Sequence, residues 1–427
     1  MSITASDCYS ICSRVSTVSF LATSLIHGSS IHFSSKNFLN LNLNYKKRRF
    51  RFCKAALITN PDDFEVGRFV GSYGFMNITS YSKFNPGSEI QYSTGDMERL
   101  KVPDVGEGSV KIRLYEGRIA QGPSKGTRVI FKVYPGQRAG GIEADMMAAN
   151  ELNAHAFLQQ SDPKDICKNI QTLLGGFETQ TGEQWLAFRN DGKYSAADYA
   201  KVTSEAISKD HALGQQKSWN PFDQEQKIKR RRYFVIQLLR GVMCGLAYMH
   251  DRERLHQSLG PASVVLNTIV EKDAAYLIPR LRDLAFSVDM RYSSLEESPG
   301  ALSEGLWRRA SIAGAFSPME KRAFGIADDI YEAGLLFAYL AFVPFCETGI
   351  MDGLSLQRLL ESTFQLDLDA AREYCLADDR LLEAVKFLDL DAGSGWELLQ
   401  AMLNPDFRKR PIAEAVLSHR FLTAAVL

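Results

Sequence analysis

The stretch LHQSLGPASVVLN, residues 255–267, has the spacing of an active-site loop but lacks the side chains that such a loop needs. His256 is followed at short range by Pro261, and the β-branched run that begins at Val264 predicts a short strand. Ser258, which lies between the His and the Pro, is uncharged and has no basicity at neutral pH. The first question is therefore whether this loop still does chemistry.

Composition limits the classes of protein that have to be considered. The 427 residues are 45% hydrophobic and 23% charged, which indicates a globular chain long enough for a two-lobed, enzyme-sized domain with additional segments. Fifty basic residues balance fifty acidic ones, so net charge gives no general attraction to nucleic acid or to anionic membranes. We expect no nucleic-acid partner, whereas peripheral membrane association stays open.

The first sixty residues differ in composition from the rest of the chain. Their only acidic residue is Asp7, serine is dense, and a basic cluster closes the stretch at 46–51. This composition is typical of an organelle transit peptide, which we expect over 1–54 with cleavage near 53–55. Chloroplast targeting is the first expectation and the mitochondrion the alternative, and a disordered tail that targets nothing also stays open.

Neither the cysteines nor the most apolar run predicts a special environment. The cysteines beyond the transit segment are widely separated, with no C-x-x-C pair among them, so neither a disulfide framework nor a zinc site is predicted. The apolar run 335–345 contains Pro344 and is about half the length that a membrane span requires. We expect it to be a buried helix and predict no transmembrane segment.

The middle of the chain has the pattern of a small antiparallel sheet with one helix. Short β-branched and aromatic runs are separated by turn residues such as Gly122, Pro123 and Gly126. The segment 66–95, which precedes these runs, is punctuated by Gly and Asn. The expected elements are strands over 110–114, 128–134, 170–178 and 183–189, and a helix through 146–157.

From Tyr194 onward the periodicity becomes helical, most clearly over 233–249, where apolar residues recur at spacings of three and four. Pro411 predicts the start of a last helix. A β-rich part followed by a helical part predicts an α+β, bilobal architecture. Its expected divisions are an N-terminal extension over 55–97, a smaller sheet lobe over 98–189 and a larger helical lobe over 190–425.

The order of these elements and the local sequences together resemble the eukaryotic-type protein kinase domain. The resemblance covers about three quarters of the chain, over 100–424. It implies the bilobal protein-kinase-like fold, with a small antiparallel β-sheet lobe plus helix before the larger α-helical lobe. The chain is identified as a degenerate, pseudokinase-like member that is targeted to plant plastids.

The resemblance assigns nucleotide contacts first to Lys132, which ends the run VIFK, and to Glu151, nineteen residues further along. In the family the Lys pairs with ATP phosphates and with a Glu on the following helix. The alternative is that this pair is only a structural ion pair. Ala187 and Phe188 are expected to lead into the hinge beside an adenine pocket.

Gly106 and Gly108 resemble the start of the family's glycine-rich loop, in which backbone N–H groups approach phosphate because side chains are missing. Lys111 stands where the third glycine belongs. The other glycine pair, Gly71 and Gly74 in FVGSYGF, lies farther upstream, and we interpret it as an extra turn.

In the family the catalytic loop reads His-Arg-Asp-Leu-Lys-Pro-x-Asn, and His256 fixes the alignment without gaps. Ser258 replaces the Asp that accepts the substrate proton, Gly260 the Lys that neutralises the γ-phosphate, and Ser263 the Asn that binds magnesium. Loss of the base alone costs a factor of about 10² to 10⁴ in rate. The resemblance therefore implies that none of the loop's catalytic groups is intact.

Asp283, in Asp-Leu-Ala, stands where the family has the magnesium-binding Asp of Asp-Phe-Gly. One carboxylate with nucleotide oxygens and water is an acceptable ligand set for Mg2+, so ATP and Mg2+ are candidate cofactors. The alternative is that Asp283 only caps a turn or helix.

Three further landmarks are expected to be structural. Asp329 should anchor the backbone of the catalytic loop from a buried central helix. Glu320 and Arg410 should form a buried ion pair in the lower lobe, and breaking such a pair costs roughly 3–5 kcal/mol. A basic cluster over 227–232 is interpreted as a solvated helix end, with a docking patch for an acidic partner as the alternative.

Two main hypotheses follow. The first is a chloroplast pseudokinase that acts as a scaffold or regulator of a protein partner. This hypothesis is compatible with ATP binding but does not require it. The second is an active, atypical Ser/Thr protein kinase that transfers the ATP γ-phosphate to a protein substrate. A third and weaker one is a kinase-like enzyme with a different ATP-dependent transfer reaction.

Overall fold

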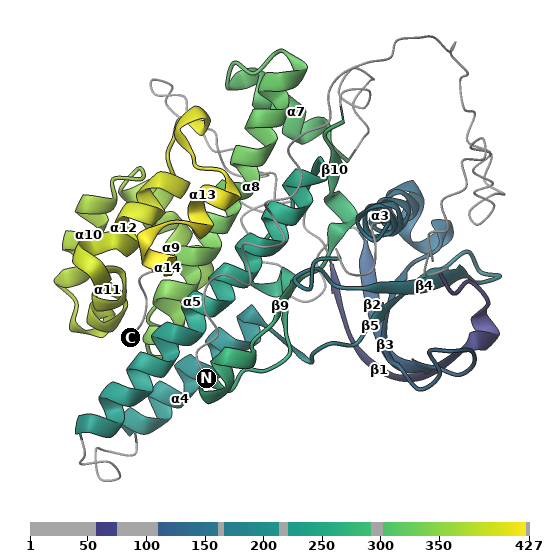
Figure 1. Cartoon of the computed structure of the whole chain (residues 1–427), viewed down its shortest axis with the longest axis horizontal. Helices are drawn as coiled ribbons and strands as arrows, with labels where there is room; N and C mark the ends of the chain where they lie inside the picture. The colour runs from purple at the N-terminus through teal and green to yellow at the C-terminus, as the bar shows by residue number, and fades with distance from the viewer. Residues whose placement is uncertain (1–56, 75–109, 161–165, 213–220, 292–301, 424–427) are drawn as a thin grey trace.

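The computed structural model describes residues 57–74, 110–160, 166–212, 221–291 and 302–423. Across these ranges a β-rich part lies on one side of the molecule and a larger helical part on the other (Figure 1). The α+β, two-lobed architecture expected from the sequence is confirmed.

The β-rich part is a five-stranded antiparallel sheet in the order β1-β2-β3-β5-β4. The helix α3 (Gln137–Leu158) packs on one face of it. The strands are β1 (Phe64–Gly74), β2 (Lys111–Ile119), β3 (Arg128–Tyr134), β4 (Leu173–Glu178) and β5 (Gln184–Arg189).

The edge strand β1 lies in a segment for which the sequence predicts no strand. It pairs with β2 from Phe64 opposite Ile119 to Gly74 opposite Lys111, with register shifts after Val66 and after Phe69. Irregular pairing and glycines interrupt the period-two alternation that reveals a strand in sequence. The sheet therefore includes residues that the expected boundary at 98 assigns to an N-terminal extension, and Gly71 and Gly74 belong to a strand instead of an extra turn.

The two faces of the sheet bury different groups. The face toward α3 carries an apolar core that includes Ile112, Leu186 and Phe188. The opposite face carries an aromatic cluster in which the Tyr115 and Trp185 rings stack with centroids 5.2 Å apart. Because side chains alternate along each strand, these two sets fix which residues point toward α3.

The helical part is built around two long helices, α5 (Pro221–Asp251), which crosses Figure 1 diagonally, and α8 (Pro318–Phe342). Both contribute to the largest apolar cluster of the described residues. The other α-helices described in this part are α4 (Ala196–Ala212), α7 (Glu304–Ile312), α9 (Gly353–Arg358), α10 (Leu368–Leu376), α11 (Leu382–Leu388), α12 (Leu390–Met402), α13 (Ala413–Leu417) and α14 (Arg420–Thr423).

Short strands connect these helices around the catalytic loop. They are β6 (Tyr194–Ser195), β7 (Arg254–Leu255), β8 (Val264–Leu266), β9 (Pro279–Leu281) and β10 (Val288–Asp289). β7 pairs with β10, and β8 lies between β6 and β9. The loop 256–263 is therefore held at both ends by strand pairing.

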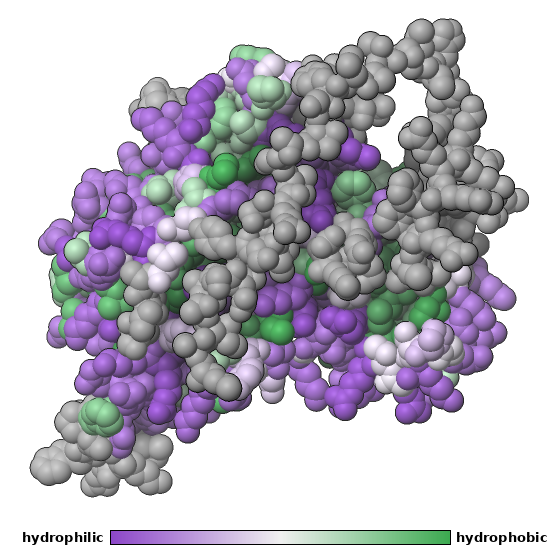
Figure 2. All heavy atoms as spheres, viewed as in Figure 1, coloured by the Kyte–Doolittle hydropathy of each residue, from purple (hydrophilic) through white to green (hydrophobic). Residues whose placement is uncertain are grey.

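Polar residues cover much of the described surface of the helical part (Figure 2). No helix within the described ranges combines the length and apolar character needed to cross a bilayer. The apolar run that begins at Leu335 forms the largely buried second half of α8.

The basic cluster over 227–232 lies inside α5 and is largely ion-paired, and Arg231 is buried, so the prediction of a solvated helix end is wrong. Four of its cations lie within 4.0 Å of a carboxylate oxygen. The pairs are Lys227 with Asp210, Lys229 with Glu225, Arg231 with Glu271 and Arg232 with Glu383.

Candidate functional site

Lys132 lies at the centre of a buried charged cluster between the two lobes. Its Nζ is 2.6 and 2.7 Å from the carboxylate oxygens of Glu151 and 2.7 Å from Oδ1 of Asp283. The exposed fractions of the three residues are 2%, 0% and 3%. Strand β3, helix α3 and the turn after β9 thus bring the three expected residues together.

The charges in this cluster stabilise one another against the cost of burial. Burial disfavours the charged form of Lys132, but Asp283 and Glu151 outweigh it, and the pKa of Lys132 is raised well above its ordinary value. Burial also acts to raise the pKa of Asp283, but Lys132 and Arg282 outweigh it and lower that pKa to about 2. Both groups are therefore ionised at neutral pH.

Two tyrosines complete the cluster, and neither is part of the sequence prediction. The Tyr134 hydroxyl donates a hydrogen bond to Glu151, and the Tyr73 hydroxyl donates one of 2.8 Å to Oδ1 of Asp283. The ring centroid of Tyr73 lies 5.9 Å from Lys132 Nζ. Burial, followed by the nearby Asp283 charge, raises the pKa of Tyr73.

Strand register explains how Tyr73 reaches this position. Tyr73 stands opposite Ile112, and two residues further along β2 Leu114 stands opposite Lys132. Residues two apart on a strand share a face, so Tyr73 and Lys132 both point toward α3.

The other residues predicted to contact a nucleotide do not lie together in the structure. Phe188 packs against the His155 ring of α3, with centroids 4.9 Å apart, and its own ring centroid is 5.8 Å from Lys132 Nζ. Ala187 belongs to the aromatic cluster on the opposite face of the sheet. Gly106 and Gly108 lie outside the described residues.

The backbone of the catalytic loop is fixed by Asp329 of α8, which is fully buried. Its Oδ2 accepts hydrogen bonds from His250 Nε2 at 2.9 Å and from the His256 N–H at 2.8 Å. Its Oδ1 accepts from the N–H and the side-chain amide of Gln257, both at 2.9 Å. The loop thus keeps a defined course through its backbone bonds to Asp329.

Ser258 makes hydrogen bonds within the protein on both its hydroxyl and its backbone N–H. Its Oγ donates a 2.7 Å hydrogen bond to the carbonyl oxygen of Asp283, and its N–H donates to Nδ1 of His256 at 3.3 Å. The Nε2 of His256 lies 3.1 Å from the carbonyl oxygen of Arg282, which fits an imidazole protonated on Nε2. Burial lowers the pKa of His256, so the ring is neutral.

Gly260 and Ser263 bond to each other instead of facing a ligand. The Ser263 hydroxyl donates to the Gly260 carbonyl oxygen and accepts from the Gly260 N–H, both at 2.9 Å. The backbone of Gly260 is extended (φ −161°), and a Cβ added there would meet no atom within 4 Å. The position therefore has room for a longer side chain, although the native residue supplies no charge.

Sequence reasoning also missed Glu332, a half-buried carboxyl one turn after Asp329 on α8. Its Oε2 accepts a 3.0 Å hydrogen bond from the Leu259 N–H of the catalytic loop. Burial, together with Asp328 and Asp329 nearby, raises the pKa of Glu332 well above its ordinary value. The i, i+3 spacing of Asp329 and Glu332 is the signal that could have revealed it.

The expected ion pair between Glu320 and Arg410 is wrong. Glu320 lies at the start of α8, where its carboxylate accepts from the N–H and the hydroxyl of Ser317, both at 2.9 Å. These bonds lower the pKa of Glu320. Arg410 instead donates to the backbone carbonyl oxygen of Ala327 at 3.0 Å. Ser317 and Glu320 form a capping box, and this local motif uses the carboxylate that the prediction assigned to Arg410.

The described residues do not fit a magnesium ion in this arrangement. No group of three or more His, Cys, Asp or Glu side chains among them is placed to hold a metal. Oδ1 of Asp283 accepts from Lys132 and Tyr73, and its Oδ2 lies 3.2 Å from Arg282 Nε. Ser263, at the second expected ligand position, has its hydroxyl bonded within the loop. We therefore derive no reaction step through a metal.

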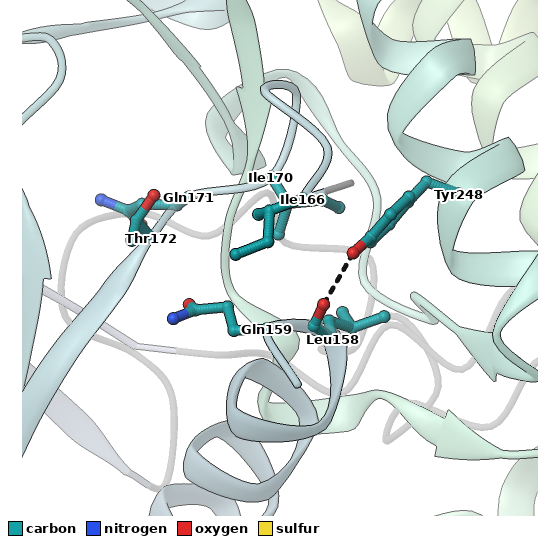
Figure 3. A pocket seen from close by; sticks show the side chains of 7 residues that line it. All are labelled: Leu158, Gln159, Ile166, Ile170, Gln171, Thr172 and Tyr248. Carbon is teal, nitrogen blue, oxygen red and sulfur yellow. Dashed lines mark hydrogen bonds between the residues drawn. The ribbon is translucent and has the colours of Figure 1, made fainter. Parts of the chain in front are cut away.

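A small cavity of about 10 Å³ lies between the end of α3 and α5 (Figure 3). The Tyr248 hydroxyl points into this region and donates to the Leu158 carbonyl oxygen at 2.7 Å. Its lining is mainly apolar, and its volume has room for about one water molecule and not for a ligand of the size of a nucleotide. It includes no member of the Lys132 cluster.

Comparison with known proteins supports the kinase resemblance. Over 320 residues the chain is 24% identical to the serine/threonine-protein kinase STN7, chloroplastic, of Arabidopsis thaliana, covering 69% of this chain and 54% of that protein. Over 259 residues it is 26% identical to STN8, chloroplastic, of the same organism, covering 56% and 49%. The chain is a distant homologue of these protein kinases. Both relatives are chloroplastic proteins.

The homology has limits in length and depth. The chain spans about half the length of these two relatives, and no protein-family model matches it. A crystal structure of a Stt7 homologue from Micromonas algae, soaked with ATP, aligns with 86% of this chain and 95% of its own. That alignment has a TM-score of 0.49 and 18% sequence identity.

Proposed function

We propose that this kinase homologue is a chloroplast pseudokinase, which scaffolds or regulates a protein partner and does not transfer phosphate. The observation that carries the proposal is the bonding of Ser258, at the position of the family's general base. Its hydroxyl donates a hydrogen bond to the Asp283 carbonyl oxygen and has no carboxylate among its hydrogen-bond partners. A neutral hydroxyl used in this way cannot accept the proton of a substrate at neutral pH.

The other two replacements act in the same direction. Gly260 provides no cation for a terminal phosphate, and the Ser263 hydroxyl is bonded within the loop. Phosphoryl transfer depends mainly on positioning and on electrostatic stabilisation of the transferring group. Three absent groups in one loop therefore remove both the base and much of that stabilisation.

A regulatory role is compatible with what the fold retains. The catalytic loop is held by three hydrogen bonds to Asp329, so it keeps a defined geometry without catalysis. Lys132 is the group through which a nucleotide phosphate would bind, and such binding would modulate the scaffold. Because the relatives are protein kinases, we propose a protein as the partner.

A second candidate function, an active atypical Ser/Thr protein kinase, is favoured by one observation. Lys132 pairs with Glu151, as phosphotransfer in the family requires, and Asp283 lies beside them. Glu332 is a nearby carboxyl with a raised pKa, although it contacts Leu259 and not Ser258. In this alternative Glu332 would be the candidate proton acceptor.

The two functions are separated by a phosphotransfer assay on the full chain, with Mg2+ and ATP labelled on the γ-phosphate. Wild type and Asp283→Ala should give the same background incorporation into the chain itself and into a generic protein substrate. The reference is the triple variant Ser258→Asp, Gly260→Lys, Ser263→Asn, which restores the family's loop. Magnesium-dependent transfer by wild type that is lost in Asp283→Ala would overturn the pseudokinase proposal.

A further inference from the structure

Asp283 is the family's magnesium ligand, yet its carboxylate is surrounded by donors from its own chain. Lys132 Nζ and the Tyr73 hydroxyl lie 2.7 and 2.8 Å from Oδ1, and Arg282 Nε lies 3.2 Å from Oδ2. A hard cation binds carboxylate oxygens through the same lone pairs that these donors occupy. The arrangement therefore disagrees with a metal site.

Of the three donors, Tyr73 is the one that the family resemblance does not account for. Lys132 and Asp283 are expected at the nucleotide site, and Arg282 precedes Asp283 in the chain. Tyr73 comes from the edge strand β1, 210 residues away in sequence, and its side chain is partly buried against the apolar core beside α3. A phenol keeps its proton at neutral pH and so acts here as a donor, not as a metal ligand.

We propose that Tyr73 is an internal latch that competes with divalent cations for Asp283. While the hydroxyl donates to Oδ1, the carboxylate is closed to a cation, and metal binding requires the end of β1 to move away. This inference goes beyond the proposed function, because it concerns occupancy of the site by a metal and not transfer of phosphate.

The gain in cation affinity on loss of the Tyr73 hydroxyl is limited by the strength of one hydrogen bond. A hydrogen bond to a charged group contributes about 1.5–3 kcal/mol, which corresponds to roughly tenfold to a hundredfold in a binding constant. Removing only the hydroxyl should therefore tighten cation binding by a factor in that range. Lys132 and Arg282 remain in place and keep the absolute affinity low.

The test is a titration of the full chain with Mn2+, followed by electron paramagnetic resonance of the unbound ion and without nucleotide. Tyr73→Phe removes the hydroxyl and keeps the ring, and we expect Mn2+ to bind on the order of tenfold to a hundredfold more tightly than to wild type. The matched control is Tyr115→Phe on β2, whose ring stacks on Trp185 on the opposite face of the sheet. It should leave Mn2+ binding unchanged.

A second variant and a double variant keep the test decisive. Tyr73→Leu also lacks the hydroxyl and replaces Tyr73→Phe if that variant does not fold. Tyr73→Phe combined with Asp283→Asn should lose the gain, because the gained ligand is the Asp283 carboxylate. Equal Mn2+ affinity in wild type and Tyr73→Phe would overturn the latch, as would the same gain in Tyr115→Phe or in the double variant.

Mn2+ affinity tests the latch, and phosphotransfer tests the proposed function, so the two proposals can fail separately. A gain in Mn2+ affinity in Tyr73→Phe without phosphotransfer supports both proposals. A gain accompanied by transfer in Tyr73→Phe supports the latch and overturns the pseudokinase. Absence of any gain overturns the latch and leaves the transfer assay on wild type to decide the function.

Discussion

The Lys132 cluster and the catalytic loop have diverged from the kinase pattern in opposite ways. The cluster keeps its charged residues and packs them against one another, so that Lys132 contacts both Glu151 and Asp283. The loop keeps its course, anchored by Asp329, and lacks the side chains that act on a substrate. In the cluster, the family's charged groups are present and bond to one another. In the loop, the backbone bonds are present, and Ser258, Gly260 and Ser263 stand at the positions of the family's catalytic groups.

This difference shows that the geometry of a site and its reactivity rest on separate residues. The loop backbone depends on Asp329 and His256, neither of which would react with a substrate, and replacement at 258, 260 and 263 leaves their bonds in place. The cluster, in contrast, consists of the reactive groups themselves. Loss of a charge should therefore be more damaging in the cluster than loss of a side chain in the loop.

The largest effect is expected for Lys132→Met. This change leaves Glu151 and Asp283 buried without their shared cation, and breaking a buried ion pair costs about 3–5 kcal/mol. Urea unfolding measures the loss of unfolding free energy. Lys209→Met, an exposed change on α4, is the control and should stay within about 0.5 kcal/mol of wild type. Equal stability of the two variants would show that the cluster is not held by its charges.

Asp329→Asn tests the frame of the loop. The substitution replaces one carboxylate oxygen with an NH2 group, which cannot accept the hydrogen bonds that His250 or Gln257 donates. Each buried donor left without an acceptor costs roughly 1–3 kcal/mol. Hydrogen exchange should then accelerate at the amides of His256 and Gln257. Asp251→Asn, at the exposed end of α5, is the comparison variant. Unchanged exchange in Asp329→Asn would mean that the loop is held by other contacts.

A pH dependence should come from His155, a neighbour of the cluster on α3. Burial and then the Lys132 charge lower its pKa from 6.5 to about 3 in the folded protein. Below pH 6.5 the His155 ring of the unfolded chain becomes protonated, whereas the ring of the folded chain stays neutral. The full contribution of His155 to the free energy of unfolding is therefore present above pH 6.5. It is lost as pH falls toward 3, by about 1.4 kcal/mol per pH unit.

His155→Leu should therefore flatten the fall in unfolding free energy between pH 6.5 and pH 4.5, whatever its effect on absolute stability. Urea unfolding at several pH values measures this slope. Other titrating groups, including His256, remain in both proteins and cancel in the comparison. An identical slope in variant and wild type would place the acid sensitivity elsewhere.

The smallest effect is expected for Ser258→Ala. It removes one hydrogen bond to a backbone carbonyl oxygen and should cost about 0.5–1.5 kcal/mol, without lowering any phosphotransfer signal. Thermal or urea unfolding measures the cost against Ser362→Ala, an exposed substitution. A fall in transfer activity in Ser258→Ala would show that this hydroxyl takes part in the chemistry.

The sequence predicted what local pattern can encode. The helix 233–249 lies inside α5, and the expected strand over 128–134 is β3, because strong periodicity marks both. Lys132 and Glu151 could be proposed as partners because the resemblance supplied their spacing. The pairing of Glu320 with Arg410 was wrong because a capping motif four residues long prevailed over a long-range analogy.

Tyr73 could not be found in the same way. Its position depends on the register of β1 against β2 across residues 75–110, and on strand irregularities after Val66 and Phe69. No local rule specifies which residue of one strand stands opposite which residue of another over such a separation. The face on which Tyr73 lies, and hence its bond to Asp283, emerges only from the assembled sheet.

The open surroundings of Gly260 bear on how readily this loop could change. A Cβ atom added there would meet no neighbour within 4 Å, and the extended backbone suits any residue. The first atom of a new side chain is thus sterically unobstructed at this site. If the protein is the proposed pseudokinase, laboratory evolution toward phosphotransfer can begin at this position without first rebuilding the core.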